Sequence, residues 1–212
     1  MLTDPETVEL RDGARVAIRP VRPSDKDPIR EGFEHLSPQS RYRRFFAPLR
    51  RLTSTDLAYL TEVDHLDHEA VVAFAGDSGE PIGVARYIRS EDPAEAEFAV
   101  AVVDHWQQRG VGTALLEQLV ARARAEGIER FVAIVLGENS EALDLYDHLV
   151  PDGAPPRRSA SGNLELVVEL PDPGEGIGSR LARILRAAAS GLVISPWRVI
   201  ARGVGAATRP LR

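Results

Sequence analysis

The residues with the clearest chemical meaning form a run from Gln107 to Gly112, between an alternating apolar segment and a long amphipathic one. Gly110 and Gly112 stand one residue apart and let the backbone bend and approach an anion closely. The helix expected after them directs its unpaired amide hydrogens and the positive end of its dipole at the same point. The spacing therefore predicts a strand-to-helix turn that holds a pyrophosphate.

Other chemistries lack the residues that they need. No Gly-Lys-Ser/Thr follows the turn, as a P-loop requires, and the third glycine of a dinucleotide-binding fingerprint is missing. Ser159 and Ser161 stand in no nucleophile elbow and form no visible triad with a histidine, which argues against a hydrolase. His65 and His68 stand at an expected loop among aspartates. Imidazoles there are more often solvated or hydrogen bonded, so we expect no metal site.

Apolar patterning predicts the elements that position the turn. Alternating or continuous apolar runs predict strands at 7–10, 15–19, 69–75, 81–90, 95–103, 131–136 and 164–170. Asp12 and Gly13 favour a hairpin between the first two strands or a single bent first strand. Helical spacing predicts helices at 24–36, 38–46, 54–62 and 140–149, and a longer one from Val111 until Gly127. This order requires a mixed, mostly antiparallel sheet of about six to seven strands flanked by helices, an α/β or α+β fold.

Composition limits the class of protein. The chain has 212 residues with 43% hydrophobic content, which fits one globular domain plus an appendage. It contains no cysteine, which excludes disulfides, thiolate metal sites and a cysteine nucleophile and favours a reducing compartment. The first ten residues carry acidic side chains and no apolar core, unlike a signal peptide. We therefore expect a cytoplasmic protein.

Charge is unevenly distributed along the chain. No acidic residue follows Glu175, whereas seven arginines do, so the preceding part is more acidic than the net charge of -6 indicates. An acidic body attracts cationic substrates and repels nucleic acid, which predicts an amine acceptor and no nucleic-acid partner.

A Pro/Gly-rich segment at 171–176 is typical of a linker, so we expect a domain at 1–172 and a linker with a basic amphipathic helical tail at 173–212. The longest apolar stretch of this tail, 187–197, is too short for the roughly 20 residues of a membrane span. Three docking surfaces for the tail stay open: the acidic body, another subunit or an anionic membrane surface.

The spacing Gln107-x-x-Gly110-x-Gly112 resembles the Arg/Gln-x-x-Gly-x-Gly/Ala signature of the GNAT superfamily of N-acetyltransferases. The family's Asn-x-x-Ala-x-x-Leu-Tyr segment is matched in register by Asn139, Ala142, Leu145 and Tyr146. The segments RPVRPSD, LSPQSRYRRFF and AEFAVAVVDHWQQRG further resemble the acetyltransferase domain of bacterial protein lysine acetyltransferases. The resemblance covers about residues 8–170 and implies a sheet that splays at the strand before the turn.

The family's cofactor, acetyl-coenzyme A (acetyl-CoA), agrees with the predicted anion site. The resemblance implies that the pantetheine arm pairs with the strand backbone, whose amides are also expected to stabilise the oxyanion. It implies that the amides of the turn surround the pyrophosphate. The cofactor-binding residues are then Val100, Ala101 and Val102 on the strand, Gln107, Gln108, Arg109, Gly110, Val111, Gly112 and Thr113 in the turn, and Asn139.

Transfer to an amine requires a base, because an unperturbed lysine ammonium has a pKa of about 10.4. The resemblance points to Glu97, which would deprotonate the amine directly or through water. Glu95 shares its strand face and is the second candidate. Burial among Ala96, Phe98 and Ala99 is expected to raise the pKa of Glu97 toward that of a useful base. The alternative is an ordinary exposed glutamate on an edge strand.

The resemblance also implies that Tyr146 protonates the leaving thiolate; the alternative is a tyrosine of the core. Asn139 either orients the pantetheine or its ordered water, or caps the helix that starts near Ser140. His68 stands just before a predicted strand and is a candidate for facing the acceptor pocket.

Three functions remain open at this point. The first is an acetyl-CoA-dependent N-acetyltransferase that works by direct ternary-complex transfer, with a protein lysine as acceptor. The second acetylates a small or antibiotic-like amine, which requires a deep, closed pocket. The third is a non-catalytic acyl-CoA sensor whose tail relays occupancy to a partner.

Overall fold

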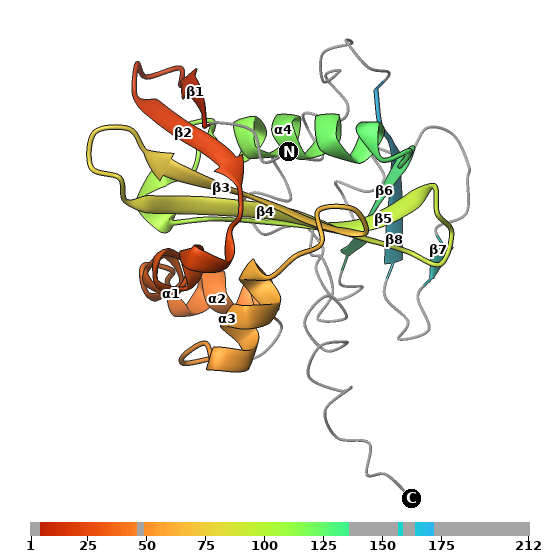
Figure 1. Cartoon of the computed structure of the whole chain (residues 1–212), viewed down its shortest axis with the longest axis horizontal. Coiled ribbons are helices and arrows are strands. Elements are labelled where there is room, and N and C mark those ends of the chain that lie inside the picture. The colour runs from red at the N-terminus through yellow and green to blue at the C-terminus, as the bar shows by residue number, and fades with distance from the viewer. Residues whose placement is uncertain (1–4, 46–48, 136–156, 159–163, 172–212) are drawn as a thin grey trace, which may run out of the picture.

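A computed structural model describes residues 5–45, 49–135, 157–158 and 164–171. In this part of the chain one sheet separates two helical layers (Figure 1). Helices α1 (Lys26–Glu34), α2 (Pro38–Phe45) and α3 (Ser54–Thr61) cover one face, and α4 (Val111–Ala125) covers the other. Two 3-10 turns, η1 (Pro23–Asp25) and η2 (Asp104–Trp106), precede α1 and the glycine turn. None of the described helices combines the length and apolarity that crossing a membrane requires.

The sheet has the order β1-β2-β3-β4-β5-β6-β8-β7, and its neighbours are antiparallel except for β5 and β6. Its strands are β1 (Glu6–Glu9), β2 (Arg15–Pro20), β3 (His68–Ala75), β4 (Pro81–Arg89), β5 (Glu95–Val102), β6 (Arg130–Val135), β7 (Arg157–Arg158) and β8 (Leu164–Glu169). The predicted mixed, mostly antiparallel sheet is confirmed. The two-residue β7 was not predicted, because it is too short to show a period.

The first two strands form the predicted hairpin. Its bend is closed by a hydrogen bond from the Leu10 amide to the Ala14 carbonyl (2.8 Å), and Gly13 adopts a φ of +81° there. The three helices that follow agree with the predicted ranges to within two residues. The predicted helix at 140–149 and the tail at 173–212 lie outside the described residues.

Alternation along β5 separates the two faces of the sheet. Phe98, Val100 and Val102 are buried in a core shared with α4, including Leu115 and Leu119. A second core lies under α1 and α3 and includes Phe33, Leu57, Leu60 and Val72. Residues at the odd positions of β5 therefore belong to the face covered by α1–α3.

Glycines at two places determine how α4 is set against the sheet. A Cβ on Gly83 would lie 3.0 Å from both the Leu115 Cδ1 and the Ala101 carbonyl oxygen, so any side chain there would push α4 or β5 outward by a few tenths of an ångström. At the far end, Gly127 has a φ of +76°, and the Ile128 amide donates to the Ala123 carbonyl (2.9 Å), which ends the helix as predicted. The N-terminus of α4 is thereby fixed beside the end of β5.

Candidate active site

The turn between β5 and α4 contains backbone in sparsely populated conformations. Gln108 has a φ of +60° and Gly110 a φ of +105°. Residues other than glycine rarely adopt positive φ, and such strained positions concentrate at functional sites. Alternating backbone handedness turns successive amides toward one side, as in anion-binding nests.

The first turn of α4 adds further donors. Gly110 is the N-cap residue and provides no side-chain cap, and the first intrahelical bond runs from the Ala114 amide to the Gly110 carbonyl (3.0 Å). The amides of Val111, Gly112 and Thr113 precede this bond and therefore have no intrahelical acceptor. With the positive end of the helix dipole, they are suited to an anionic ligand such as a pyrophosphate.

Two residues of the predicted cofactor turn have side chains that are engaged with the protein. The Gln107 Nε2 donates to the Val102 carbonyl (3.0 Å) and closes the end of β5. The Arg109 Nε donates to the Asp12 Oδ2 of the β1–β2 hairpin (2.6 Å), and its guanidinium lies 3.9 Å from the Trp106 ring centroid. These side chains stabilise the conformation of the turn, so the groups suited to bind a ligand there are its backbone amides.

The sheet opens at the strand that leads into the turn. Strands β5 and β6 pair only from Glu95 opposite Arg130 to Glu97 opposite Val132, although the described β5 continues to Val102 and β6 to Val135. The expected splay is therefore present within the described lengths of the two strands. The β5 backbone at 100–102 faces this opening with the edge not paired to β4, which fits an extended pantetheine arm.

Glu97 stands at the last paired position before the opening and is half-buried. The expectation that Ala96 and Phe98 surround it is wrong, because adjacent strand residues point to opposite faces and these two are buried in the α4 core. The buried Glu95 shares the face of Glu97, but its Oε1 accepts a hydrogen bond from the Arg130 Nε (3.0 Å). Glu97 remains the first candidate for a base because it stands where β5 and β6 part.

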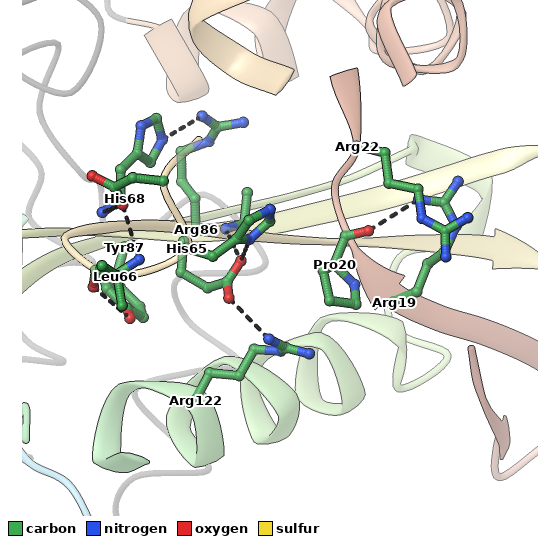
Figure 2. Close-up of polar contacts among 12 residues, drawn as sticks. Arg19, Pro20, Arg22, His65, Leu66, His68, Arg86, Tyr87 and Arg122 are labelled. Carbon is green, nitrogen blue, oxygen red and sulfur yellow. Dashed lines mark hydrogen bonds and ion pairs between the residues drawn. The ribbon is translucent and has the colours of Figure 1, made fainter. Parts of the chain in front are cut away.

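His68 and Arg86 form a polar pair on the same face (Figure 2). His68 pairs with Ile88, which pairs with Glu97, so His68 and Glu97 lie in one row, about 10 Å apart at two strand spacings. The buried Arg86 donates from Nη1 to the His68 Nε2 and from Nη2 to the Leu60 carbonyl, both at 3.1 Å. His68 thus belongs to the side of the sheet on which Glu97 lies, and Arg86 was missed in the sequence.

The protonation state of His68 follows from this contact. A guanidinium only donates, so the Nε2 accepts and the ring proton is on Nδ1. Burial and the charge of Arg86 lower the pKa of His68 from 6.5 to about 3. The imidazole is therefore neutral at physiological pH.

A separate polar cluster lies on the α4 face, where Figure 2 shows Arg122 reaching from the helix. The buried Glu69 accepts from the Arg122 Nη1 (2.9 Å) and from the Ala70 amide (2.8 Å), and its Oε1 lies 2.8 Å from the His65 Nδ1. In the described ranges no three potential ligands gather into a metal-binding group. His65 instead contacts Glu69 within this polar cluster.

An apolar groove lies between α1, α3 and the sheet and encloses about 530 Å³, part of it open to solvent. Ile29, Phe33, Leu60 and Val72 line it, and Ala101 contributes from β5. Glu97 does not line this groove.

Asn139 and Tyr146 lie outside the described residues. Their predicted roles rest on the sequence match alone.

Comparison with known proteins adds an independent finding. The profile of the Acetyltransferase (GNAT) family matches residues 31–149, more than half of the chain. The chain belongs to the GNAT acetyltransferase family. The matched segment contains the glycine turn, β5 with Glu97, and the positions of Asn139 and Tyr146. The chain is thus an enzyme of this acetyltransferase family, and its mixed sheet is the GNAT fold.

Two curated GNAT relatives have related sequences. The chain is 37% identical over 146 residues to "Acetyltransferase Pat" of Mycolicibacterium smegmatis, an alignment that covers 68% of this chain and 44% of that protein. It is 30% identical over 138 residues to "Acetyltransferase PA5475" of Pseudomonas aeruginosa, covering 64% and 74%. The chain therefore spans less than half of the length of the first relative.

Solved GNAT structures are also similar. The GNAT domain of S. lividans PAT has a TM-score of 0.66 at 35% identity, covering 78% of this chain and 97% of that one. A cAMP-binding acyltransferase from Mycobacterium smegmatis has a TM-score of 0.52 at 30% identity, covering 94% and 56%. This chain is thus similar to the whole of the first structure and to part of the second.

Proposed function

We propose that this chain is an N-acetyltransferase that transfers an acetyl group from acetyl-CoA to a primary amine within a ternary complex, with a protein lysine as the acceptor. The observation that supports it best is the position of Glu97. This carboxylate lies where β5 and β6 part, about 17 Å along an extended strand from Val102 and the amide-lined turn. One strand thereby joins a base to an anion site.

Each group has one task in this proposal. Acetyl-CoA supplies the activated acyl group. The amides of Gln108 to Thr113 hold the pyrophosphate, and the backbone of Val100, Ala101 and Val102 orients the pantetheine. Glu97 takes the proton of the acceptor ammonium, directly or through water, so that the neutral amine attacks. Tyr146 gives a proton to the leaving thiolate, and Asn139 orients the pantetheine.

The protein-lysine acceptor is supported by the sequence resemblance to bacterial protein lysine acetyltransferases and by the acidic body of the chain. We also propose a cytoplasmic location and a domain at 1–172. We propose that the basic tail docks on the acidic body. If deletion of 177–212 leaves solubility, oligomeric state and liposome binding all unchanged, this docking and its two alternatives are contradicted.

Mass spectrometry of a whole-cell lysate incubated with the chain and isotope-labelled acetyl-CoA tests the proposal. We expect labelled acetyl groups on protein lysines, and their loss when Glu97→Gln replaces the wild type. If the label is found on small amines alone, the acceptor is a small molecule and not a protein lysine. Acetyl-CoA binding without transfer to any amine would favour the non-catalytic sensor.

A further inference from the structure

Asp104 connects two segments that are far apart in the sequence. It begins η2, directly before the glycine turn, and its carboxylate meets the start of α2. The Oδ2 accepts from the Ser37 amide (2.7 Å), and the Oδ1 accepts from the Ser37 hydroxyl (3.0 Å) and the Ser40 hydroxyl (2.8 Å). Three hydrogen bonds thus hold one carboxylate at the N-terminus of a helix.

These contacts cap α2. The Arg41 amide donates to the Ser37 carbonyl (2.9 Å) and the Ser40 amide to the Ser37 hydroxyl (3.1 Å), which makes Ser37 the N-cap residue. A carboxylate at this end is favoured by the helix dipole. Burial raises the pKa of Asp104, but the hydrogen bonds from Ser37 and Ser40 outweigh burial and lower the pKa below its ordinary value. Asp104 is therefore ionised at physiological pH.

The backbone of Asp104 holds the turn. Its carbonyl accepts from the Gln107 amide (3.2 Å), and the Gln107 side chain in turn binds the Val102 carbonyl at the end of β5. Helix α2 packs against β5, the strand that carries Glu97. One residue thus contacts both the start of the cofactor turn and a helix on the face of the candidate base.

We propose that Asp104 is a positioning residue that fixes the N-terminus of α2 to the cofactor turn, so that binding of acetyl-CoA orders α2 beside Glu97. This inference rests on the proposed binding of acetyl-CoA at the turn. The side chain acts through the turn and α2 and does not contact the reacting atoms.

Titration calorimetry with acetyl-CoA and hydrogen exchange of peptides spanning 37–45 test this role in the full chain. Asp104→Ala removes all three hydrogen bonds, and we expect acetyl-CoA to bind about tenfold more weakly. The double variant Ser37→Ala/Ser40→Ala keeps the hydrogen bond from the amide of residue 37 to Asp104. Its affinity for acetyl-CoA therefore falls less, about threefold. In the wild type acetyl-CoA slows exchange in 37–45, and in Asp104→Ala this protection is absent.

Thr53→Ala is the control for the loss of a helix cap away from the turn, because Thr53 is the N-cap residue of α3 and its hydroxyl accepts from the Asp56 amide (3.1 Å). It loses comparable helix stability but keeps both the affinity and the ligand-dependent protection of 37–45. Wild-type affinity and protection in Asp104→Ala, or equal losses in Thr53→Ala, overturn the positioning role. A wild-type chain that binds no acetyl-CoA overturns the proposed function as well.

Discussion

Replacing Gly110 by alanine separates the backbone requirement of the cofactor turn from the general stability of the fold. Gly110 has a φ of +105°, and a new Cβ would meet only the Leu10 Cδ2 at 3.8 Å, so the cost is conformational rather than steric. An alanine in this left-handed region costs about 1–2 kcal/mol. Relaxation of the turn toward negative φ turns its amides away from the pyrophosphate. We therefore expect acetyl-CoA to bind about 5- to 30-fold more weakly.

Gly127→Ala provides the matched control at the opposite end of α4. Gly127 has a φ of +76° and nothing within 4 Å of a built Cβ, so its substitution carries a similar backbone cost. Urea denaturation measures the loss of unfolding free energy in both variants, and titration calorimetry measures the affinity for acetyl-CoA. Both variants lose about 1–2 kcal/mol of stability, and only Gly110→Ala loses affinity. Wild-type affinity in Gly110→Ala refutes the assignment of the pyrophosphate to this turn.

Three further predictions concern His68, Tyr146 and Glu69. Because the pKa of His68 is about 3 in the folded state and 6.5 in the unfolded chain, stability falls as the pH drops from 6.5 toward 3. His68 thereby contributes up to about 1.4 kcal/mol per pH unit to the fall in the free energy of unfolding, and His68→Asn, denatured between pH 6 and 4, lacks this contribution. If the free energy of unfolding falls with pH as steeply in His68→Asn as in the wild type, His68 is not the neutral imidazole described here. Tyr146→Phe lowers the turnover of the acetyl-transfer assay with little change in affinity for acetyl-CoA, and an unaffected rate excludes the acid role. Glu69→Gln leaves Arg122 without its buried carboxylate partner and costs about 1–3 kcal/mol in urea denaturation, with unchanged affinity for acetyl-CoA; a change in affinity places Glu69 in the site.

Local patterns predicted the elements because each signal lies within a few residues. Glycine and aspartate favour the backbone conformations found at three of these places. They are the Asp12–Gly13 hairpin, the turn at Gly110 and the end of α4 at Gly127. The row from His68 to Glu97 also follows from strand period once the register is known.

Contacts between distant segments could not be predicted from the sequence. Asp104 meets Ser37 across 67 residues and Arg109 meets Asp12 across 97, and no spacing rule encodes such pairs. For the same reason the contact between the Arg109 side chain and Asp12 was not predicted. The surroundings of Glu97 were misjudged for a different reason: sequence neighbours in a strand are not neighbours in space.

We propose that Glu97 is the base that serves an acetyl-CoA site at the end of its own strand. Single-turnover transfer of labelled acetyl from acetyl-CoA to protein lysine, measured for the wild type and Glu97→Gln from pH 6 to 9, tests it most directly. In Glu97→Gln we expect the rate to fall about 10²- to 10⁴-fold, the pH dependence that reports a single ionisation to disappear, and the affinity for acetyl-CoA to stay unchanged. A Glu97→Gln variant with the wild-type rate and pH profile would contradict it.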